Sequence, residues 1–245
     1  MKKFLFGNWK MYLDYKESVK LASVLAKKIK KSDNAVAVFP GSLSLVEVKK
    51  KLKDKISVGA QNCAWVPKGA YTGEISSYMF FDVGCEYVLI GHSERRHVFG
   101  ETNEEIRKKL EASLDAGLIP VLCVGETQKD KEEGKTQYRL KEQLMEALAG
   151  LDASADKIIF AYEPVWAIGT DNPCLPADAE DIHGWIKKEV KNYLEGEAKV
   201  IYGGSVKAEN VASFISRDTI DGVLVGIAST KIDSFLAIIK AVKNQ

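Results

Sequence analysis

The sequence predicts an α/β protein, a single-domain (β/α)8 barrel over residues 1–245. Eight short, β-rich apolar runs alternate with helical segments, at about one unit per 31 residues, which matches the size of such a barrel. Most runs are continuously apolar, as is typical of strands buried on both faces of a parallel sheet. The competing architecture, an open doubly wound sheet, usually has a glycine-rich turn after its first strand, but "FGNWKMY" contains one glycine.

The predicted strands follow one another without a linker or a low-complexity tract between them. They cover residues 4–10, 35–40, 56–62, 87–93, 119–126, 158–164, 199–205 and 222–229.

Periodic apolar residues predict helices between these strands, over residues 18–31, 102–117, 179–194 and 233–245. The first carries Val19, Ala22, Ala26 and Ile29 near one face. The second opens with the capping-box pair Thr102 and Glu105 and closes on Gly117. The weakest helical segment, 75–84, offers barely two turns, and another short helix is expected to start at Ser93.

Composition and charge narrow the function classes. Hydrophobic residues make up 46% of the chain and charged residues 28%, as in ordinary globular proteins. Lys plus Arg number 35 against 34 Asp plus Glu, so the net charge of +1 gives no reason to expect a nucleic-acid or membrane partner. The amino-terminal apolar run is too short for a signal peptide. Four widely spaced cysteines without a CxxC pair indicate reduced thiols in a cytoplasmic protein; they are Cys63, Cys85, Cys123 and Cys174.

Polar side chains occur where several predicted strands end. Asn8 and Lys10 end the first, His92 the fourth and Glu163 the sixth. Because the carboxyl ends of barrel strands meet at one rim, these residues are expected to converge there. Each has an ordinary alternative on its own, since Lys10 could reach solvent and His92 could be a structural histidine.

Glu163 has the weakest such alternative. In "FAYEPVWAIGT" (160–170) it follows a buried strand, where an unpaired carboxylate would be costly, so it must be paired or functional. Pro164 keeps it extended, and the apolar segment that follows, with Gly169 at its tip, could close over the site and exclude water. We interpret Glu163 as a proton-abstracting base.

The remaining polar features suggest the substrate. A helix beginning at Ser93 would favour a neutral His92 that donates a hydrogen bond to a carbonyl. The turns 203–205 and 226–229, after the seventh and eighth strands, offer backbone N–H groups for a phosphate. Together these residues predict that a small phosphorylated carbonyl compound is enolised by Glu163 while His92 and Lys10 polarise its oxygens.

The chain closely resembles the triosephosphate isomerase family, whose members share the TIM barrel. The matching segments lie in family order over nearly the whole chain: "GNWKM" (7–11), "AQNC" (60–63), "TGEIS" (72–76), "GHSERR" (91–96), "CVGET" (123–127), "AYEPVWAIGT" (161–170), "YGGSV" (202–206) and "DGVLVG" (221–226). This family is itself a standard example of a glutamate base paired with a neutral histidine.

The resemblance implies an intramolecular isomerase of glycolysis and gluconeogenesis, with no cofactor and no metal. Glu163 would move a proton between dihydroxyacetone phosphate and D-glyceraldehyde 3-phosphate through an enediolate, with His92 as electrophile and Lys10 as electrostatic stabiliser. Substrate would be bound by Asn8, Lys10, Gly169, Ser205, Gly226 and Ile227. Family members are typically homodimers in which the loop corresponding to 62–74 docks beside the partner's site, here with Tyr71 and Thr72 as expected contacts.

Three segments depart from the family pattern. Ile227 stands where a second glycine is usual, and it would be strained if the turn needed positive φ. The segment after the lid reads "DNPCLP" (171–176), in which Asp171 adds negative charge and Pro173 stiffens the hinge. The docking loop contains an unusual "AWVPKG", which bears on the strength of the dimer.

Two other functions remain open at this point. A Schiff-base aldolase on the same barrel would need a lysine in a dry pocket, and Lys10 is the only comparable one. A phosphate-binding or scaffold protein would keep the barrel and the turns without catalysis, because a fold alone does not establish an activity.

Overall fold

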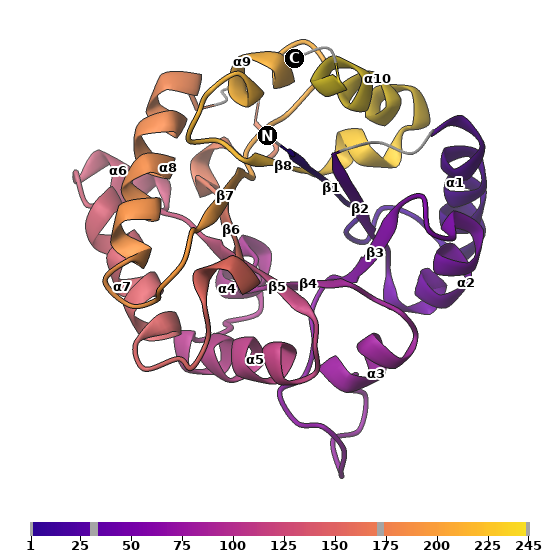
Figure 1. Cartoon of the computed structure of the whole chain (residues 1–245), viewed down its shortest axis with the longest axis horizontal. Coiled ribbons are helices and arrows are strands. Elements are labelled where there is room, and N and C mark those ends of the chain that lie inside the picture. The colour runs from indigo at the N-terminus through magenta and orange to yellow at the C-terminus, as the bar shows by residue number, and fades with distance from the viewer. Residues whose placement is uncertain (1, 30–33, 171–173, 244–245) are drawn as a thin grey trace.

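A closed barrel of eight parallel strands forms the centre of the molecule (Figure 1), and it confirms the predicted (β/α)8 architecture. The structure, a computed structural model, describes residues 2–29, 34–170 and 174–243. Strand β1 pairs with β2 on one side and with β8 on the other, which closes the sheet. The strands are β1 (Phe4–Asn8), β2 (Ala35–Phe39), β3 (Ser57–Ala60), β4 (Tyr87–Ile90), β5 (Ile119–Val124), β6 (Ile159–Tyr162), β7 (Lys199–Tyr202) and β8 (Gly222–Val225).

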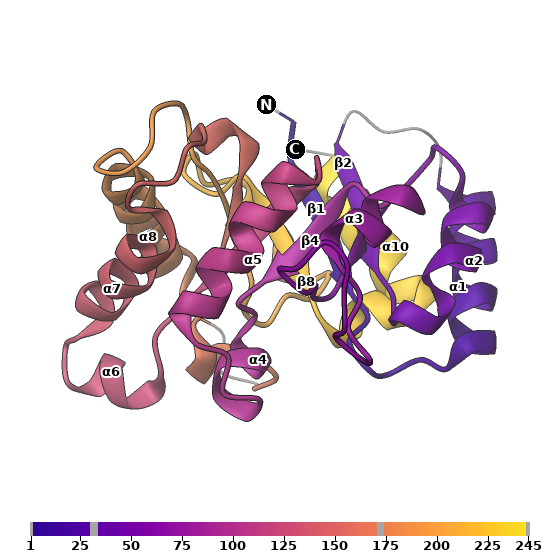
Figure 2. The same cartoon turned by 90° about the horizontal axis from the view of Figure 1, so that it is seen from below.

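Helices surround the barrel (Figures 1 and 2). Within the described residues they are α1 (Tyr15–Lys28), α2 (Ser42–Leu52), α3 (Ser77–Asp82), α4 (Ser93–Val98), α5 (Asn103–Asp115), α6 (Gln128–Glu132), α7 (Thr136–Leu148), α8 (Pro176–Val190), α9 (Val211–Ile215) and α10 (Ile232–Lys243). None of the helices in this described part is long and apolar enough to cross a membrane.

Capping explains where two of these helices begin. The predicted pair Thr102 and Glu105 forms a capping box at α5. A second capping box, between Asp14 and Glu17, starts α1 at Tyr15, earlier than the predicted residue 18. The buried stripe of α1 is therefore Ser18, Leu21, Ala22 and Leu25, and the predicted Val19 and Ala26 are only half-buried.

Two apolar clusters show why the strands are apolar on both faces. One cluster fills the barrel and includes Phe6, Phe39, Leu89, Ala161 and Leu224. The other lies between the strands and the helices. Neighbouring residues of one strand enter different clusters, since Leu5 faces the helices and Phe6 the interior. This alternation decides which residues beyond each strand face the mouth of the barrel.

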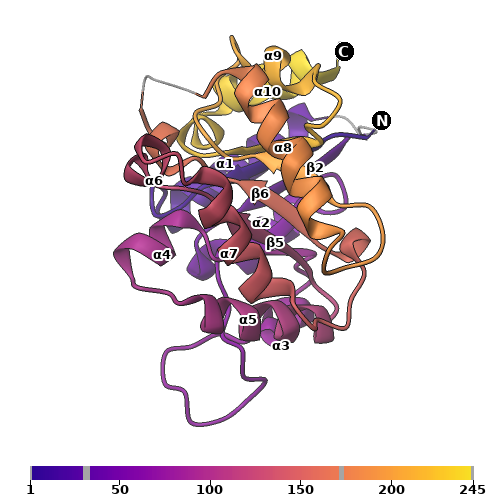
Figure 3. The same ribbon diagram turned by 90° about the vertical axis from the view of Figure 1, so that its left-hand side faces the viewer.

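The two ends of the barrel differ. The carboxyl ends of the strands lead toward α4 and α6, on the lower side of Figure 2, and the amino terminus lies on the opposite side. The segment between β3 and α3 extends away from the barrel as a long loop (Figure 3). The structure thus separates a rim that holds the predicted site residues from a projecting loop that holds Tyr71 and Thr72.

A fully buried histidine gives the fold a dependence on pH. His183 of α8 packs against Tyr162 and Tyr202, and burial, with a smaller contribution from Lys187, lowers its pKa from 6.5 to about 3. Between pH 3 and pH 6.5 the imidazole is protonated in the unfolded state but not in the folded state, so the free energy of unfolding falls as the pH drops below 6.5.

We expect His183 to lower the free energy of unfolding by about 2 kcal/mol at pH 5 relative to neutral pH. Denaturant unfolding of the wild type and of His183→Leu at pH 7 and pH 5 measures the effect, which the variant should lack.

Candidate active site

Glu163 lies at the mouth of the barrel because of the alternation in β6. Ile159 and Ala161 point into the barrel, and the next residue in this register is Glu163. Its side chain has room because position 203 is glycine, where a Cβ would lie 2.8 Å from the Cγ of Glu163. A Cβ at Gly125 would collide with the backbone carbonyl oxygen of Glu163. Two glycines of neighbouring strands therefore determine where this carboxylate can sit.

The Glu163 carboxylate is buried, with only 2% of the residue exposed, and it has partners. The backbone N–H of Ser93 donates to Oε2 at 2.8 Å, and Nε2 of His92 lies 3.2 Å from Oε1. His92 is itself only 6% exposed. The arrangement places a carboxylate and an imidazole side by side in a site largely closed to water.

A hydrogen bond to the His92 ring indicates its tautomer. Helix α4 begins at Ser93, as predicted, and His92 is its N-cap. The backbone N–H of Glu94 donates to Nδ1 of His92 at 3.3 Å, so Nδ1 is an acceptor. A neutral ring then carries its proton on Nε2, the atom that faces Glu163 and the cavity. This is the protonation state needed to donate a hydrogen bond to a substrate oxygen.

Lys10 does not lie on a strand, because β1 ends at Asn8. It occupies the following turn with a positive φ of 49°. Its ammonium forms an ion pair of 2.6 Å with Glu94, which follows His92 in α4. The next residue, Arg95, pairs in turn with Glu101.

The lid segment is attached through Trp166. The 3-10 helix η2 (Val165–Ala167) follows Pro164, and the Trp166 indole N–H donates to the buried carboxylate of Glu126 at 2.8 Å. The hydroxyl of Tyr162 donates to the same oxygen at 3.1 Å. Burial raises the pKa of the Glu126 carboxyl, and these two donors oppose the rise. Gly169 follows in the left-handed region, with φ of 68°, as a turn at a lid tip requires.

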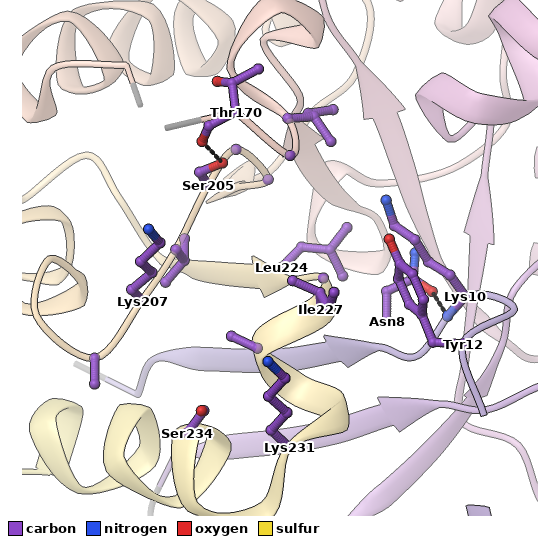
Figure 4. A pocket seen from close by; sticks show the side chains of 18 of the residues that line it. Asn8, Lys10, Tyr12, Thr170, Ser205, Lys207, Leu224, Ile227, Lys231 and Ser234 are labelled. Atoms are coloured by element: carbon purple, nitrogen blue, oxygen red, sulfur yellow. Dashed lines mark hydrogen bonds between the residues drawn. The ribbon is translucent and has the colours of Figure 1, made fainter. Parts of the chain in front are cut away.

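A cavity of about 660 Å³ is lined by residues that follow β1, β4, β6, β7 and β8 (Figure 4). Its lining contains most of the predicted site residues, namely Asn8, Lys10, His92, Glu163, Gly169, Ser205, Gly226 and Ile227. The Ser205 hydroxyl lies 2.8 Å from the carbonyl oxygen of Ala167 and 3.0 Å from that of Thr170, so its single proton is shared between them and holds the lid (Figure 4). Tyr71 and Thr72 lie outside the cavity, on the projecting loop.

Asp171 and Pro173 of the altered hinge lie outside the described residues. Within the described ranges, no three His, Cys, Asp or Glu side chains are grouped so as to hold a metal ion.

Ile227 is not strained, because its turn does not require positive φ. Ile227 is the first residue of the 3-10 helix η3 (Ile227–Thr230), and it is not among the described non-glycine residues with positive φ, which are Lys10 and Lys53. A β-branched residue adopts this conformation without strain, and the Ile227 side chain is about half exposed at the edge of the cavity. Glycine is therefore not required at this position.

We accordingly expect Ile227→Gly to leave binding of a phosphorylated substrate unimproved, with KM changing by less than about threefold, because there is no strain to relieve. Steady-state kinetics checks this. A KM that falls tenfold would show that the isoleucine obstructs the turn.

Two residues at the site were missed by sequence reasoning. Glu94 pairs with Lys10 across 84 positions of sequence, and Gln61 donates a hydrogen bond to the backbone carbonyl of Lys10. Neither shows a local pattern that marks it. The "AQNC" segment contains Gln61, but only as part of a family resemblance.

The closed parallel barrel, with a buried carboxylate and imidazole in a cavity at the carboxyl ends of its strands, defines a (β/α)8-barrel enzyme with an acid–base centre. Residues 3–242 match the family model described as triosephosphate isomerase. The chain belongs to the triosephosphate isomerase family.

Curated relatives agree with this assignment. Triosephosphate isomerase of Aquifex aeolicus is 42% identical over 244 residues, which cover 98% of this chain and 99% of the relative. The proteins of the same name from Dictyoglomus thermophilum and Hydrogenovibrio crunogenus are each 43% identical. They align over 98% and 99% of this chain, and over 99% and 98% of their own lengths.

Proposed function

We propose that Glu163, His92 and Lys10 carry out the reaction of this family, the interconversion of dihydroxyacetone phosphate and D-glyceraldehyde 3-phosphate. The chain is an isomerase of triose phosphates, as its family and the names of its relatives indicate, and a role in glycolysis follows from the family. The assignment of roles to residues rests mainly on one observation, the buried Glu163 carboxylate 3.2 Å from Nε2 of His92.

The proposed chemistry is a proton transfer between neighbouring carbons. Glu163 leaves the Ser93 N–H, takes a proton from C1 of dihydroxyacetone phosphate and returns one to C2, while the hydroxyl proton of O1 is lost and O2 gains one, so that the carbonyl moves from C2 to C1. His92 donates its Nε2 proton in a hydrogen bond to the oxygen that becomes negative, which stabilises the enediolate. Lys10 supplies a fixed positive charge beside the same oxygens and the phosphate. No step requires a metal or an organic cofactor.

Phosphate binding is assigned to the turns after β6 and β8 that line the cavity. Gly169, Gly226 and Ile227 offer backbone N–H groups, and Asn8 lies with Lys10 at the end of β1 (Figure 4). Ser205 holds the lid in the state seen here, so its hydroxyl would have to exchange the Ala167 and Thr170 carbonyls for the phosphate. The lid would then close over a bound dianion.

The two alternative functions are disfavoured by specific features. A Schiff-base aldolase needs a lysine in a dry pocket, whereas Lys10 forms an ion pair of 2.6 Å with the half-exposed Glu94. A phosphate-binding scaffold has no use for a buried carboxylate adjacent to an imidazole.

Isomerisation in deuterium oxide tests the enediolate. We expect D-glyceraldehyde 3-phosphate formed from dihydroxyacetone phosphate to carry solvent deuterium at C2, because the proton on a carboxylate exchanges with water before it is returned. Nuclear magnetic resonance of the product measures the label. Rapid conversion with no solvent label would contradict an intermediate whose transferred proton exchanges with water.

We also propose that the enzyme is a homodimer formed through the projecting loop. Tyr71 and Thr72 are exposed, and large apolar side chains are also exposed on the loop after β1 and from α1 to α4. Met11 is 97% and Leu43 is 95% exposed, and exposed apolar side chains in such numbers favour a protein–protein contact. A second copy, with its own loop, would cover them. The apolar set comprises Met11, Tyr12, Tyr15, Leu43, Val46, Trp65, Tyr71, Ile75, Tyr78, Met79, Val98 and Phe99.

We expect Thr72→Arg to convert the dimer to a folded monomer at micromolar concentration, because a cation on the loop would be buried against the partner without a counter-charge. Light scattering after gel filtration measures the mass, and circular dichroism checks the fold. Tyr138→Arg is the matched control, since Tyr138 is also exposed but lies on α7, outside the apolar set. A wild type that is already monomeric would contradict the proposed dimer.

We propose that the whole chain forms one domain, because all eight strands form one sheet. The four free, buried cysteines suit a reducing cytoplasm, where we expect the enzyme to work.

A further inference from the structure

The backbone of Lys10 adopts a conformation that a lysine does not favour. Its φ is 49°, a region that side chains with a Cβ avoid and that glycine adopts readily. Such a conformation persists only where surrounding contacts enforce it, and in enzymes it is often found at functional positions. The contacts that enforce it here therefore help to place the Lys10 ammonium.

Two side-chain amides hold this residue from both sides. Oδ1 of Asn8 accepts from the backbone N–H of Lys10 at 3.0 Å. Nε2 of Gln61 donates to the carbonyl oxygen of Lys10 at 2.9 Å and also to the carbonyl oxygen of Phe39 at 2.8 Å. Gln61 directly follows β3, and Phe39 is the last residue of β2. One amide group thus fastens the Lys10 turn to the ends of two neighbouring strands.

We propose that Gln61 is a positioning residue for Lys10, which fixes the left-handed backbone of residue 10 and so keeps the ammonium at the cavity. The proposal rests on the proposed role of Lys10 in binding the phosphorylated substrate. Gln61 need not touch substrate, and it is absent from the residues that line the cavity. Without its two hydrogen bonds, the turn can relax to negative φ and the ammonium leaves its place.

The requirement for an amide is specific. Both partners of Nε2 are carbonyl oxygens, so the group must donate two hydrogen bonds from one nitrogen. Methionine keeps the length of the side chain without a donor. Glutamate keeps the shape but turns acceptor oxygens toward two carbonyls. Neither can replace glutamine in this role.

The first test compares binding with turnover in Gln61→Met. We expect KM for D-glyceraldehyde 3-phosphate and the inhibition constant of glycerol 3-phosphate to rise together by about 5- to 20-fold, as the loss of a well-placed charged contact implies, with a smaller fall in kcat. Gln143→Met is the matched control. Gln143 also bonds two backbone groups, the N–H and C=O of Gly125, but on the far side of the site from Lys10. This variant should lower the thermal midpoint without weakening glycerol 3-phosphate binding.

The second test asks whether the effect passes through Lys10. Glycine at position 10 accepts positive φ and has no ammonium to place, so Gln61→Met should weaken glycerol 3-phosphate binding far less in a Lys10→Gly background. An equal effect in both backgrounds, or a fall in thermal midpoint with unchanged binding in the single variant, would overturn the proposal. If Gln61→Met folds poorly, Gln61→Glu is measured instead. It should bind glycerol 3-phosphate no more tightly than is expected of Gln61→Met.

Calorimetric binding of glycerol 3-phosphate keeps the two proposals separate. A wild type that binds this ligand but does not isomerise triose phosphates would contradict the proposed function and leave the role of Gln61 measurable. A crystal structure of Gln61→Met offers a direct check, because φ of Lys10 should leave the left-handed region.

Discussion

We expect Glu163→Asp to reduce kcat by at least about 10²-fold while the protein remains folded, because proton transfer depends steeply on the position of the base. The carboxylate of Glu163 reaches the Ser93 N–H at 2.8 Å and lies 3.2 Å from His92. Shortening the side chain by one methylene withdraws it from both contacts and from a substrate carbon. Steady-state kinetics in both directions gives the loss, and circular dichroism and thermal unfolding verify the fold.

Glu180→Asp is the matched control for this experiment. Glu180 lies on α8, where it pairs with Arg217 at the outer surface, so shortening it should leave kcat within about twofold of the wild type. Near-normal turnover by Glu163→Asp would show that another group removes the proton.

The second large effect is expected from Lys10→Met. Removing the ammonium should lower kcat/KM by about 10- to 10²-fold, mainly through KM, because a charged hydrogen bond contributes roughly 1.5–3 kcal/mol to binding of an anion. The Glu94 side chain is 46% exposed, so water can solvate it once its partner is gone and the fold should survive. Inhibition by glycerol 3-phosphate measures the loss of ground-state binding separately from turnover.

Lys141→Met serves as the control for charge, since Lys141 is an exposed lysine of α7. It should shift kcat/KM by less than about twofold. If Lys10→Met bound glycerol 3-phosphate as tightly as the wild type does, the ammonium would have no part in holding the substrate.

Much of the fold could be predicted because barrel strands leave a local signal. Continuous apolar runs located all eight strands. Because Ile159 and Ala161 face the barrel interior, the alternation along β6 also directs the Glu163 side chain to the mouth of the barrel. Strand ends were predicted one to four residues too long, because the polar and glycine residues that follow the strands, such as Asn62, His92 and Gly203, were counted with them but belong to turns. The start of α1 was missed because its cap, Asp14, precedes the apolar pattern.

The site was predictable in its principal residues but not in its internal connections. Glu163, His92, Lys10 and the turns do converge on one cavity. The contacts that arrange them join distant positions, such as Lys10 with Glu94 and Gln61 with Lys10, and no local pattern encodes them. Positive φ, which was considered only as a condition for Ile227, is found at Lys10, because backbone conformation in a turn depends on which side chains hold it.

The most direct test of the central claim is a coupled assay with purified wild-type protein and Glu163→Gln. D-glyceraldehyde 3-phosphate is supplied, and its conversion is followed as NADH oxidation through glycerol-phosphate dehydrogenase. We predict rapid turnover by the wild type and almost none by Glu163→Gln, whose amide has nearly the same shape but cannot accept the proton. Equal turnover by the two folded proteins would contradict the claim that Glu163 is the base, and a folded wild type without turnover would contradict the function itself.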